Sequence, residues 1–358
     1  MKANMKTQSN SPNLPENPPA NEDKVIAEVI QCSIGVLDKE TDPVQRQQHP
    51  KSHGCVKAEF IVEDVPEECR FGIFREPRRY SAFVRFSNGS MKPQQDSEGD
   101  VRGMAIKLLG VEGEKLLEEE RQAQTQDFIL INHPVLFLKD AQDSLDFAKA
   151  VQMAKKMPFK PLKPLPLLLM YVPSHLKQFK ILKTIQKKTV TNQLQIQYWS
   201  TTPYKLGDRV IKFSVKPSVT QSNIQIAPNL ESENFLREVI VEHLSKQEVY
   251  FDFLVQLQKN PDQMPVEDAT AEWSETDSPF IKVANIRIPM QTFDTEARRR
   301  FDENLSFNPW HALPEHQPLG GINRVRKYVY QAIAAIRHKL NKVTVQEPTI
   351  NDFNNPTI

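Results

Sequence analysis

The order of strand-like and helix-like segments constrains the fold of this chain more than any other feature. Six short stretches rich in Val, Ile and Phe, each bounded by turn residues, predict β-strands: Ala58–Val62, Ser81–Phe86, Ala105–Leu109, Asp127–Ile131, Val210–Val215 and Ile281–Ile288. Helices are expected at Ala141–Met157, at Glu231–Lys259 and at Gly321–Lys342, the last because apolar residues recur there at helical spacing. Strands dominate the first half and helices follow, which predicts an α+β fold whose antiparallel barrel or sheet carries helices on one side.

The composition excludes several classes of protein. The 358 residues are 39% hydrophobic and 25% charged with a formal net charge of +1, so the chain can build a core and is not a dedicated nucleic-acid binder. Cys32, Cys55 and Cys69 are too few for a disulfide scaffold and lack paired metal-ligand spacing. No glycine-rich phosphate loop follows a strand, no stretch reaches the roughly 18 consecutive apolar residues of a membrane span, and no signal peptide is visible. A cytoplasmic location is therefore expected.

Length and proline content bear on domain organisation. At roughly 150 residues per domain, the length predicts about two domains. The 27 prolines against 11 glycines indicate linkers or long irregular connections. Residues 1–24 are polar and rich in Pro and Asn, which predicts a disordered arm, and residues 346–358 are expected to form a flexible tail.

Residues 147–207 contain no Asp or Glu. Nine lysines surround a Pro/Leu run within this block: Lys155, Lys156, Lys160, Lys163, Lys177, Lys180, Lys183, Lys187 and Lys188. A basic amphipathic block of this kind predicts peripheral contact with an anionic membrane through residues 155–188, or attraction of an acidic ligand. The alternative is a solvated basic face of two helices.

Isolated residues carry little chemistry. There is no G-x-S-x-G nucleophile elbow and no H-E-x-x-H zinc helix. His49 and His53 have a spacing that could hold a metal on a helix, but Pro50 and Gly54 disfavour a helix there.

Five segments taken together are more informative. HPKSHGCVKAEF (residues 49–60), AFVRFSNG (82–89), DVRGMAIKLLG (100–110), DFILINHPVLFLKD (127–140) and RKYVYQAIAAIR (326–337) occur in this order. The succession resembles the haem catalase superfamily over about residues 45 to 342, and the length is similar to its compact branch of catalase-related peroxidases and coral-type allene oxide synthases. The resemblance implies a catalase-like antiparallel β-barrel with surrounding and C-terminal helices. It also implies a single haem domain over residues 25–345 and haem b, iron protoporphyrin IX, as cofactor.

On the proximal side, the resemblance implies that Tyr330 is the axial ligand of the iron. A free phenol has a pKa near 10, so the phenolate needs a nearby positive charge. Arg326 lies four residues earlier, on the same face of a helix, and is expected to supply it. Arg337 corresponds to an arginine that binds a haem propionate. The alternative is that these residues form the polar edge of an amphipathic helix.

On the distal side, the resemblance implies a histidine that moves protons during peroxide cleavage. Counting back from the following strand favours His53, while the H-x-K pattern of the family makes His49 the competitor. Ser87 corresponds to a serine that orients this histidine, and Arg85 to an arginine that binds a propionate. The family also places an arginine three residues before the distal histidine; counted from His53 it is missing, and Lys51 is expected in its place.

Two distal positions depart from the family. Strict alignment puts Ile131 at the place of the distal asparagine, so either Asn132 takes that role through a shift of one residue or the polar partner is missing. The phenylalanine that stacks on the haem has no direct match, and Leu145 or Phe147 is expected to substitute. An apolar distal residue points away from efficient catalase turnover.

The leading hypothesis is a haem-dependent oxidoreductase that acts on hydrogen peroxide or an organic hydroperoxide as its small-molecule partner. Its alternatives are rearrangement of a fatty-acid hydroperoxide of the allene oxide synthase type and a non-catalytic haem-binding or peroxide-sensing protein. A lipid-binding module without haem is a further alternative. The resemblance also implies a homo-oligomer, and no nucleic-acid partner is expected.

Overall fold

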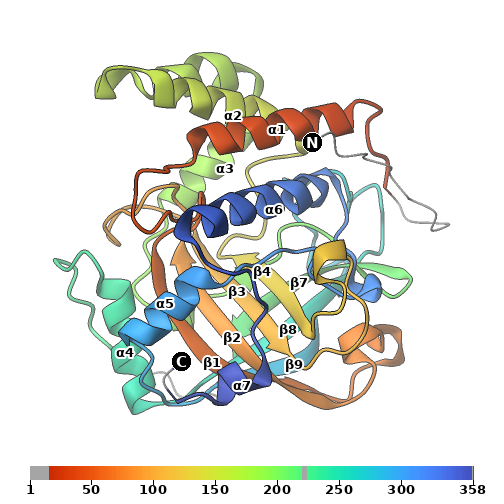
Figure 1. The fold of residues 1–358 in the computed structure, drawn as a ribbon. Coiled ribbons are helices and arrows are strands. Elements are labelled where there is room, and N and C mark those ends of the chain that lie inside the picture. Colours follow the sequence, from red (N-terminus) through yellow and green to blue (C-terminus); the bar gives the residue numbers. More distant parts are fainter. Residues whose placement is uncertain (1–15, 220–223, 357) are drawn as a thin grey trace.

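An antiparallel β-barrel forms the centre of the molecule (Figure 1). The structure is a computed structural model that describes residues 16–219, 224–356 and 358. Eight strands close the barrel in the order β5-β4-β3-β2-β1-β9-β8-β7, because β5 pairs with both β4 and β7, and β6 extends the sheet beyond β7. The strands are β1 (Ser52–Val62), β2 (Arg78–Asn88), β3 (Arg102–Leu109), β4 (Thr125–Ile131), β5 (Tyr198–Trp199), β6 (Tyr204–Leu206), β7 (Arg209–Pro217), β8 (Val249–Leu257) and β9 (Ile281–Ile288). All six strands predicted from the sequence lie within these segments.

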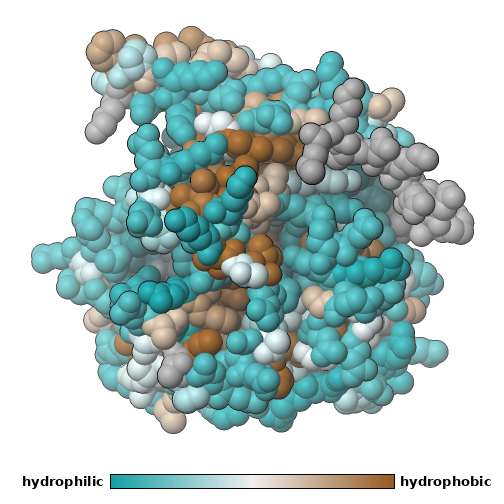
Figure 2. Space-filling model, viewed as in Figure 1, coloured by the Kyte–Doolittle hydropathy of each residue, from teal (hydrophilic) through white to brown (hydrophobic). Residues whose placement is uncertain are grey.

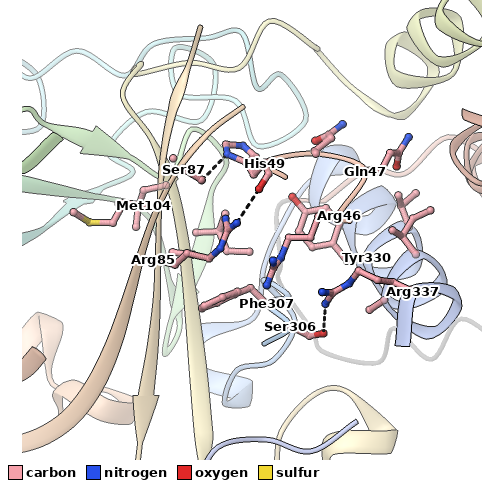
Figure 3. A pocket seen from close by; sticks show the side chains of 18 residues that line it. Arg46, Gln47, His49, Arg85, Ser87, Met104, Ser306, Phe307, Tyr330 and Arg337 are labelled. Carbon is pink, nitrogen blue, oxygen red and sulfur yellow. Dashed lines mark hydrogen bonds between the residues drawn. The ribbon is translucent and has the colours of Figure 1, made fainter. Parts of the chain in front are cut away.

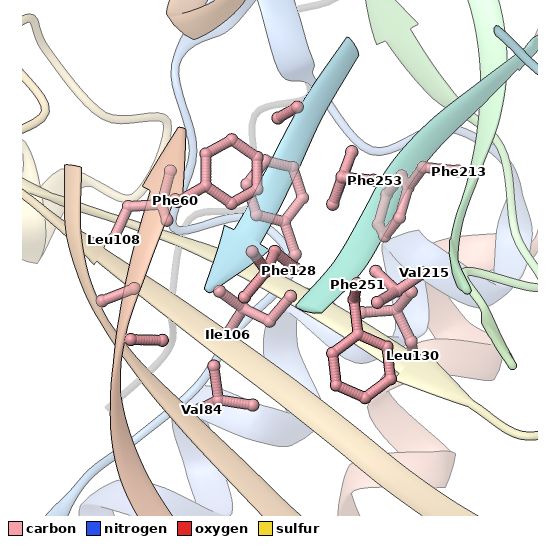
Figure 4. Close-up of a cluster of buried hydrophobic side chains, with 14 of the residues drawn as sticks. Phe60, Val84, Ile106, Leu108, Phe128, Leu130, Phe213, Val215, Phe251 and Phe253 are labelled. Atoms are coloured by element: carbon pink, nitrogen blue, oxygen red, sulfur yellow. The ribbon is translucent and has the colours of Figure 1, made fainter. Parts of the chain in front are cut away.

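The interior of the barrel is filled by aromatic and aliphatic side chains (Figure 4). The Phe253 ring lies 5.2 Å from the Phe60 ring and 5.0 Å from the Phe128 ring, centroid to centroid. Alternate residues of a strand point to opposite faces, so each strand can direct one row of apolar side chains inward. The outer face of the barrel is thereby free to carry polar groups.

One predicted helix is wrong in its second half. The segment Glu231–Lys259 contains helix α4 (Phe235–Lys246) followed by strand β8. Val249, Phe251, Phe253 and Val255 alternate with partly exposed residues over most of β8, and this period of two is the pattern of a half-buried strand. These residues form a strand and do not continue the helix, because they pair with both β7 and β9 in the barrel.

The helices surround the barrel (Figure 1). Helix α6 runs beside it, and α1 and α2 lie together on the outer side of α6, where Val25, Val29, Leu145 and Val325 belong to one buried cluster. No helix of the described residues is long and apolar enough to cross a bilayer. The helices are α1 (Glu22–Val36), α2 (Ala141–Lys156), α3 (Leu176–Gln186), α4 (Phe235–Lys246), α5 (Glu296–Asn304), α6 (Gly321–Asn341) and α7 (Ile350–Asn354).

The described parts of both terminal segments contact the rest of the chain. Residues 1–15 of the expected arm lie outside the described residues, but α1 already begins at Glu22, whose carboxylate pairs with Arg324 at 2.5 Å. In the expected flexible tail, Phe353 of α7 packs on Phe83 and Glu347 contacts Lys107 at 2.6 Å. Single apolar or charged side chains that find buried partners hold these polar segments, and composition does not reveal such contacts.

Candidate functional site

A cavity of two adjoining chambers lies between the outer face of the barrel and the helices around α6. The barrel-side chamber has a volume of about 140 Å³, and the helix-side chamber of about 150 Å³. Four residues line both chambers: Gln47, Gln48, Val329 and Tyr330.

His49 lies at the barrel side of the cavity (Figure 3). Its Nδ1 is 2.9 Å from Ser87 Oγ on β2, and Arg85 on the same strand face donates to the His49 carbonyl at 2.9 Å. A Cβ on Gly103 of β3 would lie 2.6 Å from the imidazole and 2.8 Å from Ser87 Oγ. The glycine of the R-G-x-A segment therefore leaves the space in which His49 and Ser87 meet.

The surroundings of His49 keep its imidazole neutral. Burial, together with the positive charges of Arg85, Arg326 and Arg46, lowers the pKa of His49 to about 3. When Nδ1–H donates to Ser87, the lone pair of Nε2 is free to accept a proton. The φ angle of 56° at His49 lies in the left-handed region that residues other than glycine seldom adopt. Strain of this kind concentrates at functional sites, which fits a histidine held for chemistry.

Three arginines converge at one end of the barrel-side chamber: Arg46, Arg85 and Arg337 (Figure 3). Arg85 pairs with Asp302 at 2.7 Å, and Glu303 lies 3.3 Å from Arg46 and 3.2 Å from Arg337. Burial and the charges of Arg85 and Arg337 lower the pKa of Arg46 to about 9. Burial opposes ionisation of Asp302, but Arg85 and Arg46 hold its pKa below the usual value. Three guanidinium groups facing two carboxylates leave a positive charge that favours an anionic ligand.

Helix α6 brings Tyr330 into both chambers from the side opposite the barrel. Arg326, one turn earlier, lines the helix-side chamber and donates to Thr202 Oγ1 at 3.2 Å. Arg337, two turns after Tyr330, donates to the Leu305 carbonyl at 3.0 Å and is almost fully buried. The helix thus places these three predicted residues along the cavity.

His53 and Lys51 lie outside the cavity. His53 is fully buried with Nε2 2.8 Å from Asn88 Oδ1, and burial lowers its pKa to about 4. Lys51 pairs with Asp96 at 2.7 Å and donates to the Glu233 carbonyl. The structure therefore places His49, and not His53, beside Ser87. His53 already belongs to β1, whose pleat directs its ring into a buried polar network.

The remaining predicted residues are divided between the cavity and its surroundings. The Asn132 side-chain oxygen accepts from the Arg102 amide at 2.7 Å, and Asn132 does not line either chamber. Ile131 does not line either chamber, whereas Ile129 and Leu130 of β4 line the barrel-side chamber with apolar side chains. Phe147 of α2 lines the helix-side chamber and packs edge-on against Phe137 at 5.0 Å.

Arg46 and Gly103 are site residues that the sequence predictions omitted. Arg46 stands three residues before His49, which is the spacing that the family resemblance implies for a propionate-binding arginine. The sequence prediction missed Arg46 because it looked for this arginine three residues before His53, where Pro50 stands. Gly103 lies in a quoted motif, but its role requires the close approach of His49, which only the tertiary structure shows.

Comparison with known proteins gives a consistent result. The barrel, its helices and the cavity define the haem-catalase type of fold, and the catalase family model matches residues 18–342. No curated protein sequence matches. A fungal catalase aligns with a TM-score of 0.63 at 19% identity, covering 83% of this chain and 61% of that one. A bacterial catalase aligns with a TM-score of 0.63 at 16% identity, and the alignment covers 95% of this chain and 67% of that one. Catalase A from Saccharomyces cerevisiae aligns with a TM-score of 0.64 at 16% identity, and the alignment covers 94% of this chain and 70% of that one.

The chain belongs to the catalase family. It spans about 61% of the length of the fungal catalase. Membership of the family implies a haem cofactor. The cavity suits such a group, because it combines apolar walls, a phenol on one side and an excess of guanidinium charge that matches haem carboxylates.

Proposed function

We propose that this protein is a haem-dependent oxidoreductase that acts on peroxides, with haem b as its cofactor. The observation that carries the proposal is the placement of His49 with Ser87, Tyr330 and an arginine cluster around one cavity. In this proposal Tyr330 ligates the iron as a phenolate, with Arg326 one turn away as the positive charge. The cluster of Arg46, Arg85 and Arg337 binds the propionates.

The residues of the chain have defined tasks in this proposal. His49 Nε2 accepts the first proton of a bound peroxide and returns it to the departing oxygen, while Ser87 fixes the imidazole orientation. The bound haem supplies the oxidation and reduction of the peroxide. The apolar wall of Ile129 and Leu130 donates no side-chain hydrogen bond to the peroxide. This wall favours an organic hydroperoxide over hydrogen peroxide.

The helix-side chamber supports a fatty-acid hydroperoxide as substrate, and hence rearrangement of the allene oxide synthase type as the second candidate. Its lining is largely aliphatic and aromatic, and it adjoins the barrel-side chamber at Tyr330. An acyl chain can lie there while its hydroperoxide group reaches His49. A homo-oligomeric state, as the family resemblance implies, is part of the proposal.

The test uses the haem-loaded protein, its Tyr330→Phe variant, hydrogen peroxide and linoleate hydroperoxide. We expect a ferric tyrosinate absorption spectrum that changes in Tyr330→Phe, and consumption of the lipid hydroperoxide faster than by free haem. Oxygen release indicates catalase turnover, oxidation of an added electron donor indicates peroxidase turnover, and loss of hydroperoxide without a donor indicates rearrangement. An unchanged spectrum in the variant contradicts the Tyr330 assignment. Consumption of neither peroxide contradicts both enzymatic functions and leaves a haem-binding or sensing protein.

A further inference from the structure

The segment after α2 exposes a concentrated set of large apolar side chains. We name it the apolar tip, with six members: Phe159, Leu162, Leu165, Leu168, Leu169 and Met170. Phe159 is 64% exposed and Leu169 66% exposed. Figure 2 shows brown and tan residues along the upper left edge of the molecule, where Figure 1 places the helical segments around α2. Single exposed apolar residues are common, but a contiguous group marks an interaction surface.

The base of the apolar tip is firmly attached, so its exposure is part of the fold. Tyr171 directly follows the tip, is almost fully buried and donates to Asp143 Oδ1 of α2 at 2.5 Å. Its ring packs edge-on against Phe147 at 5.4 Å and stacks on His175 at 4.1 Å. These contacts hold the segment on α2 while the tip faces outward.

Exposed lysines flank the apolar tip along the chain, and we name them the lysine rim. Within the described part of the chain, the structure gives neither an ion pair nor a hydrogen bond to the side chains of five exposed lysines of the acid-free block 147–207: Lys156, Lys163, Lys180, Lys183 and Lys187. The whole chain has a formal charge of only +1, so this positive charge is a local concentration. Apolar side chains flanked by lysines match the interface of a bilayer that carries anionic headgroups.

The positive charge of the lysine rim also indicates whether the apolar tip binds a second copy of the chain or a bilayer. A second copy of the chain would bring the lysines of both copies together in a symmetric interface, which like-charge repulsion opposes. Lysine is moreover depleted at the centre of protein–protein interfaces. We propose that the apolar tip and its lysine rim dock the protein on anionic phospholipid bilayers.

The position of the surface is compatible with the proposed substrate but does not depend on it. Helix α2, which leads to the apolar tip, contributes Phe147 and Val151 to the helix-side chamber. Docking would hold this chamber near a source of acyl hydroperoxides. The docking itself requires no haem chemistry, so its failure is distinguishable from failure of the proposed function.

The experiment is co-sedimentation of the haem-loaded protein with vesicles of phosphatidylcholine, with and without phosphatidylserine. We expect binding only to vesicles with phosphatidylserine, and weaker binding at high salt. The double substitution Leu168→Glu and Leu169→Glu should weaken binding roughly tenfold or more. The matched control is Met290→Glu, because Met290 is 61% exposed and lies outside the apolar tip.

A second pair of variants tests the lysine rim. Lys163→Gln with Lys180→Gln should weaken binding to phosphatidylserine vesicles, while Lys216→Gln with Lys259→Gln, two exposed lysines elsewhere, should not. Unchanged haem absorption and melting temperature establish that each variant is folded. The proposal is overturned if the protein binds neither vesicle, if the tip and control variants bind equally, or if the apolar tip instead forms a dimer that Leu169→Glu dissolves.

Discussion

His49 and His53 are four residues apart and both have a lowered pKa, yet they have different surroundings. His49 borders the cavity and contacts Ser87. His53 contacts Asn88 and lies near Asp96, away from the cavity. Burial alone therefore does not identify the residue that can meet a substrate; access to the cavity does.

Substitution of each histidine by glutamine separates the two roles. In His49→Gln, peroxide turnover per bound haem should fall by at least about 100-fold, because an amide cannot accept and return the proton. In His53→Gln, turnover should persist while the free energy of unfolding decreases, because the buried network with Asn88 and Asp96 changes. Initial rates and urea unfolding of both variants measure this. Loss of turnover in His53→Gln with an intact haem spectrum, and its retention in His49→Gln, would reverse our assignment.

At the scale of elements, the C-terminal segment is tied to the barrel by a buried ionic group. Lys107 of β3 is fully buried between Asp127 and Glu347, at 2.6 Å from each. Glu347 also accepts from Thr125 Oγ1 at 2.7 Å. His311 lies beside them with Nδ1 2.5 Å from Glu120. A charged side chain of the tail thus completes a set of charges on the outer face of the barrel.

Removal of the Glu347 carboxylate should weaken the attachment of the C-terminal segment to the barrel. Glu347→Ala should lower the free energy of unfolding by about 2 kcal/mol, because breaking a buried ion pair is costly but Lys107 keeps Asp127 as a partner. Glu275→Ala, at an exposed carboxylate, is the control and should have little effect. Equal unfolding midpoints in urea for both variants would show that the tail contributes nothing.

At the scale of the whole molecule, several buried histidines link stability to pH. Burial lowers the pKa of His316 to about 3 and that of His53 to about 4. His316 Nε2 accepts a hydrogen bond from the Ile73 amide at 3.0 Å, which a protonated ring could not do. The unfolded chain titrates near the ordinary histidine pKa of about 6.5 and binds more protons than the folded chain below that pH.

Stability should therefore fall as the pH drops from about 6.5 to 4. His53 alone corresponds to about 3 kcal/mol over this window. Burial also raises the pKa of Asp127, Asp100 and Glu16, which opposes the trend, but these are three carboxyl groups against six histidines with a lowered pKa. Urea unfolding at a series of pH values measures the slope, and His316→Gln should make it shallower. A flat profile between pH 6.5 and 4 would contradict this account.

The local pattern of the chain was sufficient for most of the elements. The six predicted strands lie within observed strands because alternation records which face is buried, and the order of motifs identified the catalase family, which the family match confirms. Arg326, Tyr330 and Arg337 could be placed along one side of a helix because helical spacing brings them together. Residues 249–257 were missed because a short alternating strand directly follows a helix.

The sequence by itself determined six of the eight barrel strands, helix α6 and the family, because these depend on short-range periodicity and on the order of motifs. Only the tertiary structure decided which histidine meets Ser87, because the strand that begins at Ser52 turns His53 inward while the preceding loop brings His49 to the cavity. It likewise decided that Arg46 joins Arg85 and Arg337, and that the apolar tip stays exposed. These outcomes depend on contacts between distant segments, which local pattern does not encode.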